Sequence, residues 1–309
     1  MGTRTALVFS GQGSQAVGMG KDLFETSPEC RSLFEKADAL LGFSLSKICF
    51  EGPEEELKKT PNTQPALLVV SMAALTLLKK DGQAIDAVAG HSLGAYSALV
   101  AAGVLSFEDG VRLVRRRGEL MEEAGRNKGT MAVILNLEES KVDQACKESA
   151  HLGVVEPANV NCPGQIVISG ERNAVLAACE KAKALGAKRA MELPVSGPFH
   201  CSLMGQAAET FKKTIDTYEF HKPLITYYSD IDGVPMDDPE SIKDSLVRQL
   251  VSPVQWIKVI DRLAQDGIGK FIEVGAGKVL SGLIRKIKAD IPVLNAGDMA
   301  SITALKGGS

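Results

Sequence analysis

Short apolar runs and longer amphipathic stretches alternate along most of this chain. Residues 5–10 form an apolar run that predicts a strand, and the glycine-rich turn after it leads into helical sequence as far as residue 41. A second short strand is predicted at residues 85–89, followed by a turn and by helix from residue 95 onward. Strands that lead through glycine-rich turns into helices are typical of α/β proteins. The pattern therefore predicts an α/β fold.

The order of the predicted elements changes between residues 127 and 195. Here the pattern predicts strands at residues 130–135, 154–160, 165–169 and 188–193, and helices at residues 138–150 and 171–185. The order strand, helix, strand, strand, helix, strand (βαββαβ) is the ferredoxin-like plan. We therefore expect a ferredoxin-like subdomain at residues 127–195, inserted into a main domain that is formed by residues 1–126 and 196–309.

The remaining segments include the longest apolar stretches, at residues 65–78 and 95–105. Both are shorter than the ~20 residues that a membrane-spanning helix needs, so we expect them to be buried helices of a soluble protein. A polar, proline-bounded stretch at residues 51–65 precedes the first of them. A late strand is predicted at residues 270–274, before another glycine-rich turn and a helix, and residues 307–309 are expected to be a flexible end.

Composition and charge narrow the classes of function. The 309 residues carry a formal net charge of −3 at pH 7, which gives no general attraction to nucleic acid or to an anionic membrane surface. The N-terminal apolar run is too short for a signal peptide, so we expect a cytoplasmic protein. The six cysteines include no C-x-x-C pair, and only four histidines accompany them. We therefore expect free thiols and no structural zinc site.

The most informative motif is GHSLG at residues 90–94, which fits the pattern G-x-S-x-G. It lies between a predicted strand and a predicted helix, which is the context that this motif requires. A serine on such a sharp turn projects from the carboxyl end of its strand, so Ser92 is the candidate nucleophile. The backbone N–H of Leu93 can then face a developing oxyanion. The competing interpretation is a chance match in a glycine-rich α/β protein.

A serine hydroxyl needs a base to take its proton, so one of the histidines should approach Ser92. His200 follows a rigid, mostly apolar segment that can hold an imidazole still, which makes it the candidate base. A core or hinge histidine would fit the same segment. His91 is adjacent to Ser92, but its side chain diverges across the turn, so we expect it in a pocket wall. His151 and His221 lie in polar segments and are expected at the surface.

The amphipathic helix predicted at residues 109–124 carries an arginine on its apolar side. At 3.6 residues per turn, Arg117 falls in the middle of the apolar half, between Leu113 and Leu120. A guanidinium that faces a core stays charged and has to be paired. Either a carboxylate of the protein or a carboxylate of a substrate would pair with it. A structural ion pair, or a side chain that reaches back to water, is the competing interpretation.

Two glycine-rich turns resemble nucleotide-binding motifs without matching them. GQGSQA at residues 11–16 nominally fits G-x-G-x-x-A, but no second strand ending in an acidic residue follows it at the required distance. GAGK at residues 275–278 lacks the first glycine and the Ser or Thr of a phosphate-binding P-loop. We therefore expect neither a nicotinamide cofactor nor nucleotide hydrolysis.

Several blocks in one order over nearly the whole chain resemble the malonyl-CoA:acyl carrier protein transacylases of type II fatty acid synthesis. The blocks are GQGSQ at 11–15, NTQPA at 62–66, GHSLG at 90–94, RG at 117–118, GPFH at 197–200, VRQL at 247–250 and FIEVG at 271–275. The resemblance implies an α/β-hydrolase-like main domain with an inserted ferredoxin-like subdomain, which agrees with the predicted elements.

The resemblance also implies roles for single residues. Ser92 would become malonylated and His200 would be its general base. Gln12 and the amide of Leu93 would form the oxyanion hole, and Arg117 would hold the malonyl carboxylate through two hydrogen bonds.

Three further positions belong to the same implied site. The family lacks the usual acid of a catalytic triad, so a backbone carbonyl near Gln249 would orient the imidazole, and we nominate no aspartate. His91 and Phe199 would line the substrate site, and Phe199 would favour malonyl over methylmalonyl. Position 95 departs from the family pattern, because Ala95 stands where many members have glutamate. That departure leaves the charge near the pocket mouth open.

The implied activity is malonyl transfer from malonyl-CoA to the phosphopantetheine thiol of holo acyl carrier protein, as an [acyl-carrier-protein] S-malonyltransferase. The expected partners are acyl carrier protein and coenzyme A, with no metal or cofactor and with the chain as a monomer. Three alternatives stay open: a serine thioesterase or esterase, a discrete trans-acting acyltransferase of a polyketide synthase, and a non-catalytic module with the same fold.

Overall fold

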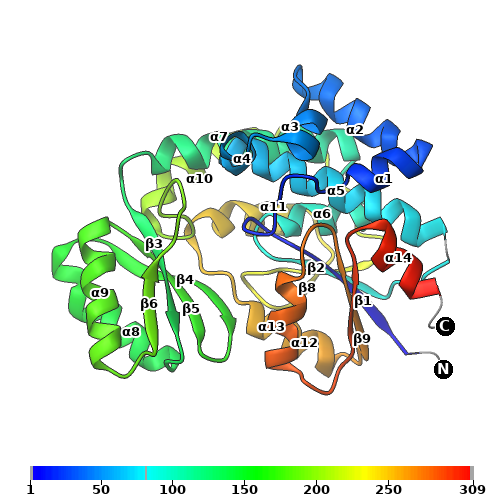
Figure 1. The fold of residues 1–309 in the computed structure, drawn as a ribbon. Coiled ribbons are helices and arrows are strands. Elements are labelled where there is room, and N and C mark those ends of the chain that lie inside the picture. The colour runs from blue at the N-terminus through cyan, green and yellow to red at the C-terminus, as the bar shows by residue number, and fades with distance from the viewer. Residues whose placement is uncertain (1–2, 81, 307–309) are drawn as a thin grey trace.

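The computed structural model of this protein describes residues 3–80 and 82–306. The predicted flexible end at residues 307–309 lies outside the described residues. The chain forms a larger α/β part and a smaller unit, drawn in green on the left of Figure 1. The chain leaves the larger part after residue 125 and returns to it before residue 200, so the smaller unit is an insertion.

The larger part is built on one six-stranded sheet. Its strands are β1 Thr5–Phe9, β2 Ala87–Gly90, β7 Thr226–Tyr228, β8 Pro235–Met236, β9 Lys270–Val274 and β10 Val293–Ala296. The strand order is β10-β9-β1-β2-β7-β8, and neighbours run parallel except for the antiparallel pair β7 and β8. Parallel strands with both faces covered are buried throughout, which explains why β1 is apolar at nearly every position.

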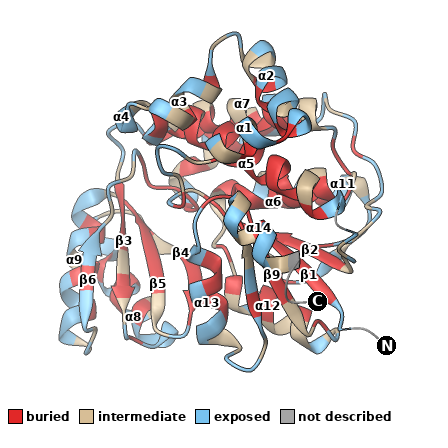
Figure 2. Cartoon of the chain, turned by 45° about the vertical axis from the view of Figure 1, so that its right-hand side comes forward, coloured by how far each residue is buried: buried red, intermediate tan, exposed pale blue. Residues whose placement is uncertain are grey.

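Helices cover both faces of the large sheet. The helices of the larger part are α1 Lys21–Thr26, α2 Pro28–Leu41, α3 Leu45–Glu51, α4 Glu54–Lys58, α5 Thr60–Lys80, α6 Gly94–Ala101, α7 Phe107–Gly125, α10 Gly205–Ile215, α11 Pro239–Arg248, α12 Trp256–Gln265, α13 Val279–Ile287 and α14 Met299–Lys306. Leu7 and Phe9 of β1 pack in the core that contains α5, α6 and α7. Ala6 and Val8 point the other way, into the core that contains α12 and α13. The strand alternation therefore divides the main core into two layers (Figures 1 and 2).

The smaller unit has the predicted ferredoxin-like arrangement. Its elements are β3 Thr130–Leu135, α8 Glu139–Ser149, β4 Val155–Cys162, β5 Gln165–Gly170, α9 Arg172–Ala184 and β6 Arg189–Glu192. The four strands are antiparallel in the order β4-β5-β3-β6, and α8 and α9 pack on one face of this sheet (Figure 1). The sheet of the smaller unit contacts the larger part of the molecule, where β4 packs next to α12 and α13.

The long apolar helix begins earlier than the sequence pattern predicted. We expected it to begin at residue 65, whereas α5 begins at Thr60 and contains Pro65. A proline at this position cannot donate a hydrogen bond to the carbonyl of Pro61, four residues before it. That carbonyl instead accepts a hydrogen bond of 3.1 Å from Nη1 of Arg115. The side chain of Arg115, from α7, thus replaces the hydrogen bond that Pro65 cannot donate. Pro65 was the reason for predicting the start of the helix there.

Helix α5 is also longer than the expected apolar stretch. It has 21 residues, and by length and composition alone it could cross a membrane. However, 83% of its most apolar window is buried inside the protein, between α2, α7 and the large sheet. Its apolar surface is therefore already covered by the fold, as expected for a core helix.

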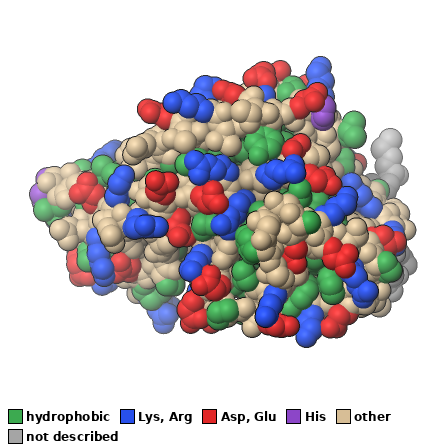
Figure 3. Space-filling view, turned by 90° about the horizontal axis from the view of Figure 1, so that it is seen from above, with side chains coloured by type: hydrophobic (Ala, Val, Ile, Leu, Met, Phe, Trp, Pro, Cys, Tyr) green, Lys and Arg blue, Asp and Glu red, His purple; other side chains and the backbone are tan. Residues whose placement is uncertain are grey.

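Charged side chains of both signs are mixed over the surface. Figure 3 shows Lys and Arg side chains mixed with Asp and Glu side chains over one face of the molecule. Several charged side chains of the described residues form ion pairs one helical turn apart, such as Lys58 with Glu54 and Arg262 with Asp266. Exposed pairs of this kind contribute little to stability, and their mixture agrees with the small net charge.

Candidate active site

Ser92 lies on the sharp turn between β2 and α6. Its backbone has φ of 52°, a left-handed conformation that is unfavourable for a residue with a Cβ atom. The flanking glycines allow the chain to pack closely at this turn. A Cβ atom on Gly90 would lie 1.9 Å from the carbonyl carbon of Gly94, and one on Gly94 would lie 2.0 Å from the carbonyl oxygen of Phe9. The local chain conformation therefore depends on both glycines of the motif.

The side chain of His200 lies against the Ser92 hydroxyl. Its Nε2 atom is 2.8 Å from Oγ of Ser92, and its Nδ1 atom is 2.7 Å from the backbone oxygen of Gln249. A carbonyl oxygen can only accept, so Nδ1 carries the hydrogen and donates it to Gln249. Nε2 is then the acceptor, and the Ser92 hydroxyl donates to it. This hydrogen-bond pattern is the one needed for proton transfer from serine to histidine.

His200 is almost completely buried, with 4% of its surface exposed. Burial, and to a smaller extent the nearby Arg117 guanidinium, lowers the pKa of His200 to about 3. The imidazole is therefore neutral near pH 7 and can accept a proton. Like Ser92, His200 has a left-handed backbone, with φ of 60°. Two residues with unfavourable backbone conformations thus face each other in this site.

Arg117 points from α7 to the same hydroxyl and is 1% exposed, as the helix pattern predicted. Its Nη2 atom donates to Oγ of Ser92 at 3.2 Å and to Oε1 of Gln249 at 3.1 Å. Its Nη1 atom donates to Oε1 of Gln64 at 2.9 Å, and the guanidinium lies 5.3 Å from the ring centre of Tyr96. Nε finds no acceptor in the described part of the chain.

The hydrogen-bond partners of Arg117 are neutral. None of the ion pairs between described residues includes Arg117, so its charge is met by amides, a hydroxyl and an aromatic ring rather than by a carboxylate. A buried cation whose partners are all neutral is well suited to bind an anionic group of a ligand.

A cavity of about 490 Å³ opens at these groups, within the size range of small-molecule sites. The sequence-predicted residues that line it are Gln12, His91, Ser92, Leu93, Arg117, Phe199 and His200. Gln249 lies behind them and reaches His200 and Arg117 by its hydrogen bonds. All of the predicted site residues are therefore brought together in one region.

The sheet of the smaller unit forms one wall of the cavity. Apolar side chains of β3 and β5, among them Val133 and Val167, line this wall together with polar side chains of β4. One of these polar residues, Asn161, accepts a 2.8 Å hydrogen bond through Oδ1 from Nε2 of His91. Because Oδ1 is an acceptor, Nε2 of His91 carries the hydrogen. Burial lowers the pKa of His91, so it is a neutral member of the wall.

Sequence reasoning missed three buried polar residues of this site: Gln64, Asn161 and Asp230. Gln64 was inside a quoted block, but nothing in the block indicated that it contacts Arg117. Asn161 lies on a strand of the smaller unit, and only the packing of the two parts brings it to His91. Asp230 follows β7, a strand that the pattern did not predict, and it contacts Ser92 and Gln249. Asp230 makes no hydrogen bond with His200 among the described contacts.

Three other positions resolve expectations from the sequence. His151 and His221 are exposed, as expected. Ala95 is fully buried in α6 and packs in the main core. Ala95 is not among the residues that line the cavity, so it adds no charge of its own there.

The chain is similar to acyl transferases over nearly its whole length. The model of the acyl transferase domain family matches residues 6–303. A malonyl CoA-acyl carrier protein transacylase of Bacillus subtilis is 46% identical over 302 residues, which are 97% of this chain and 95% of the relative. One of Staphylococcus aureus is 46% identical over 291 residues, 94% of either chain.

Solved structures give the same result. An acyl carrier protein S-malonyltransferase of Vibrio cholerae has a TM-score of 0.95 and 43% identity, covering 98% of this chain and 100% of that one. A malonyl-transacylase in complex with its type II polyketide synthase acyl carrier protein has a TM-score of 0.97 and 42% identity, covering 99% of this chain and 100% of that one. The chain therefore belongs to the acyl transferase family and, within it, to the malonyl CoA-acyl carrier protein transacylases.

Proposed function

We propose that this chain transfers the malonyl group of malonyl-CoA to the phosphopantetheine thiol of holo acyl carrier protein, through a malonyl ester of Ser92. One observation carries the proposal: Oγ of Ser92 lies 2.8 Å from Nε2 of His200 and 3.2 Å from Nη2 of Arg117, inside one cavity. A base that can activate the hydroxyl and a cation that can bind a carboxylate thus meet at the same oxygen.

In the first half of the reaction, Nε2 of His200 takes the hydroxyl proton while Oγ of Ser92 attacks the thioester carbon of malonyl-CoA. The carbonyl oxygen becomes an oxyanion, which Gln12 and the backbone N–H of Leu93 stabilise. The bond from carbon to sulfur then breaks. Coenzyme A leaves as a thiol with the proton from the imidazolium, and the malonyl group stays on Ser92.

In the second half, the phosphopantetheine thiol gives its proton to His200 and attacks the ester carbon of malonyl-Ser92. The ester bond breaks, the proton returns to Oγ, and the malonyl group leaves on the carrier protein. Every step is a proton or acyl transfer that side chains and backbone amides can perform, so the proposed mechanism uses no metal ion or cofactor. The backbone oxygen of Gln249 keeps the imidazole in the required tautomer throughout.

Arg117 holds the free carboxylate of the malonyl group in this proposal. Its guanidinium lines the cavity and has only neutral hydrogen-bond partners, which a substrate carboxylate can replace. Binding at this point fixes the acyl group relative to Ser92 and helps to keep water from the ester. Phe199 and His91 line the rest of the acyl site. We expect Phe199 to favour malonyl over the bulkier methylmalonyl group.

We assign the catalytic groups to a domain formed by residues 1–126 and 196–309, and one wall of the substrate cavity to a subdomain at residues 127–195. The wall and the catalytic groups line the same cavity, which supports this division of roles. We also propose that the protein works in the cytoplasm as a monomer.

The test is intact-mass measurement after mixing the purified chain with malonyl-CoA. We expect the wild type to gain one malonyl group, Ser92→Ala to gain none, and holo acyl carrier protein to remove the group from the wild type. An unmodified wild type, or an adduct that persists in Ser92→Ala, would overturn the proposal.

A polyketide carrier protein is the second candidate acceptor. The observation that favours it is the similarity to a malonyl-transacylase solved with a type II polyketide synthase carrier protein. Transfer rates from the malonylated chain to a fatty-acid carrier protein and to a polyketide carrier protein decide between them. We expect faster transfer to the fatty-acid carrier, and a strong preference for the other would reverse this choice.

A further inference from the structure

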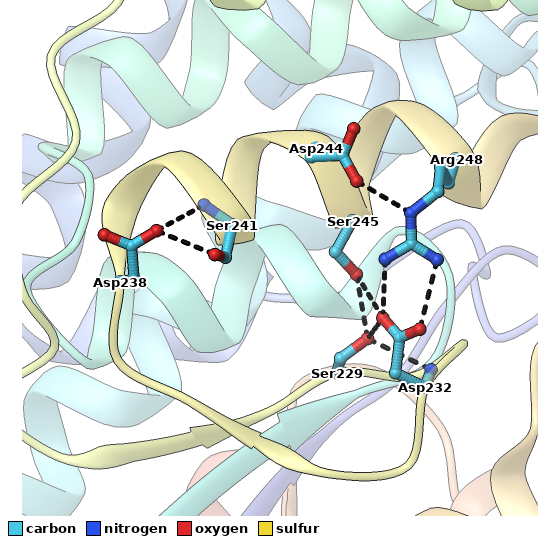
Figure 4. A network of polar contacts seen from close by, with 7 residues as sticks. All are labelled: Ser229, Asp232, Asp238, Ser241, Asp244, Ser245 and Arg248. Carbon is cyan, nitrogen blue, oxygen red and sulfur yellow. Dashed lines mark hydrogen bonds and ion pairs between the residues drawn. The ribbon is translucent and has the colours of Figure 1, made fainter.

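The turn after β7 carries two aspartates that bind two consecutive residues at the end of α11. Asp232 pairs with the guanidinium of Arg248 through two contacts of 3.1 Å and also accepts hydrogen bonds from two serine hydroxyls (Figure 4). Asp230, two residues earlier, binds the side chain of Gln249. The turn therefore holds Gln249 in place, and the backbone oxygen of Gln249 accepts the hydrogen bond from Nδ1 of His200.

Every hydrogen-bond partner of the Asp230 carboxylate is a donor. Oδ2 accepts the backbone N–H of Ser92 at 2.7 Å and Nε2 of Gln249 at 2.9 Å, and Oδ1 accepts Nε2 of Gln249 at 2.8 Å. The residue is 1% exposed, so water cannot replace these contacts easily. A carboxylate is an acceptor at both oxygens, whereas an amide would present an N–H group to one of these donors.

Gln249 connects Asp230 to Ser92, Arg117 and His200 by hydrogen bonds. Its Nε2 atom also donates to the backbone oxygen of Ser92 at 3.0 Å, and its Oε1 atom accepts from Arg117. Its own backbone oxygen accepts from Nδ1 of His200. The backbone of Ser92 is therefore held on both sides, and both Ser92 and His200 have left-handed conformations that the surroundings must maintain.

Asp230 also accounts for how Arg117 can be buried without a direct carboxylate partner. The two charges lie on opposite sides of the Gln249 amide, and each favours the charged form of the other. The guanidinium is thus partly compensated by a charge that occupies none of its N–H donors. A direct ion pair would compensate the charge more fully but would occupy the donors that a substrate carboxylate needs.

We propose that Asp230 is a positioning residue for acyl transfer, whose carboxylate holds the Ser92 backbone directly and holds His200 and Arg117 through Gln249. This inference rests on the proposed function, because it concerns how fast Ser92 is loaded. It adds a buried acid to a site in which the histidine itself has a carbonyl rather than an acid as its partner.

The protonation of Asp230 provides a readout that a purely structural residue would lack. Burial raises the pKa of Asp230 to about 6, against the opposing effects of Gln249, the Ser92 amide and Arg117. The other titratable groups that face it are Tyr96 and Tyr227, and burial raises both of their pKa values. Loss of an acceptor oxygen below about pH 6 should therefore slow the loading of Ser92.

The histidines of the site do not account for such a change near pH 6. Burial lowers the pKa of His200 to about 3, and it lowers the pKa of His91 as well. A fall in the loading rate near pH 6 in the wild type that is missing in Asp230→Asn would therefore identify Asp230 as the group that titrates.

The experiment measures the rate of malonyl loading on Ser92 by rapid quench and intact mass, from pH 4.5 to 8, for the wild type and Asp230→Asn. We expect the amide to slow loading roughly 10- to 100-fold at pH 7.5, because a small misplacement of reacting groups costs up to about 10²-fold. We also expect the acid-side fall near pH 6 to disappear in this variant.

Asp238→Ala is the matched control. Asp238 caps the start of α11 by hydrogen bonds to Ser241 (Figure 4). It is exposed and is not among the residues that line the cavity. We expect it to lower the melting temperature while leaving the loading rate and its pH profile unchanged. Loading of Asp230→Asn at the wild-type rate with the acid-side fall intact would overturn the inference. A wild type that is not loaded at all would instead reject the proposed function.

A second measurement covers the case in which Asp230→Asn does not fold. The backbone ¹H–¹⁵N resonance of Ser92 in the wild type should titrate with a midpoint near pH 6, because its N–H is bonded to Oδ2 of Asp230 at 2.7 Å. A resonance that stays constant through this range would overturn the inference, and this readout does not depend on activity with malonyl-CoA.

Discussion

Oγ of Ser92 takes part in two different hydrogen bonds. It donates towards Nε2 of His200 and accepts from Nη2 of Arg117, so one oxygen meets a base and a cation. The lowered pKa of His200 keeps the base neutral, and the neutral partners of Arg117 leave the cation available. His200 can therefore activate the nucleophile while a different residue, Arg117, binds the substrate.

Substitution of Arg117 tests whether its role is to bind a carboxylate. In Arg117→Ala we expect transfer of malonyl to fall roughly 100-fold (about 3 kcal/mol), because a charge-assisted contact is lost. Loading from acetyl-CoA, which has no free carboxylate, should survive or improve. Loading rates with both thioesters provide the measurement.

Arg112→Ala is the control, because Arg112 lies on the exposed side of the same helix and pairs with Asp109. It should leave both rates unchanged. Equal losses of malonyl and acetyl loading in Arg117→Ala would contradict the assigned role and would favour a general serine esterase.

Phe199 tests the size selectivity of the acyl site. It lines the cavity next to His200 and is nearly buried. Because one methylene in a tight pocket changes selectivity by roughly 10- to 200-fold, Phe199→Leu should raise the rate with methylmalonyl-CoA relative to malonyl-CoA by about 10-fold. Competition between the two thioesters, read by intact mass, measures this ratio. An unchanged ratio would place the selectivity elsewhere in the cavity.

At the scale of elements, the close approach of α5 and α7 positions Arg117. A Cβ atom on Gly118 would lie 2.8 Å from Cα of Pro61 and 2.8 Å from the carbonyl oxygen of Thr60. Replacement of glycine by alanine inside a helix usually stabilises a protein by about 0.5–1 kcal/mol. Here the backbone of α5 blocks the new methyl group, so Gly118→Ala should destabilise the protein by about 1–3 kcal/mol.

Gly282→Ala provides the opposite case. Gly282 lies in α13, is exposed, and has no atom within 4 Å of a new Cβ. We expect this substitution to raise the free energy of unfolding by about 0.5–1 kcal/mol. Urea unfolding of both variants measures the two changes in the free energy of unfolding, which we expect to have opposite signs. A Gly118→Ala protein as stable as the wild type would show that α5 and α7 can move apart without loss of stability.

The predicted elements agree with the structure where a short run of the sequence has a clear period of apolar residues. The six elements of the smaller unit and their order follow from short periodic runs between glycines and prolines. Strands β7, β8 and β10 were not predicted, because they have two to four residues and too few apolar positions for a period. The start of α5 was also misplaced, since the side chain that compensates for Pro65 comes from another helix.

At the scale of the whole molecule, two buried groups give opposite contributions to stability as pH changes. The pKa of His200 falls from 6.5 to about 3 on folding, so its contribution is present above 6.5 and is lost as pH falls towards 3. The pKa of Asp230 rises from 3.8 to about 6, so its contribution is present below 3.8 and is lost as pH rises through 6. Between about pH 4 and 6 the two effects oppose each other.

Asp230→Asn should remove one of these contributions. The stability of the wild type relative to this variant should therefore increase as pH falls from 6.5 to 4, by up to about 3 kcal/mol for a pKa that moves from 3.8 to about 6. Thermal unfolding of both proteins at several pH values measures the difference. A difference that does not change with pH would contradict the raised pKa of Asp230.

The sequence by itself determined the parts of this site that depend on local patterns. The serine turn follows from two glycines between a strand and a helix, and the inward direction of Arg117 follows from helical periodicity. The family resemblance then indicated one activity for both features. The serine turn and the direction of Arg117 could be predicted because each depends only on residues that are close together in the chain.

Only the tertiary structure decided which side chains meet. Ser92 and Asp230 are 138 positions apart in the chain, and His200 and the carbonyl of Gln249 are 49 apart. Asp230 occurs after a strand too short to predict, and no pattern of spacing distinguishes it from an acid on the surface. The physical reason is that burial and donor geometry arise when separate elements pack, so the chemical role of a buried polar residue is a property of the folded molecule rather than of its segment.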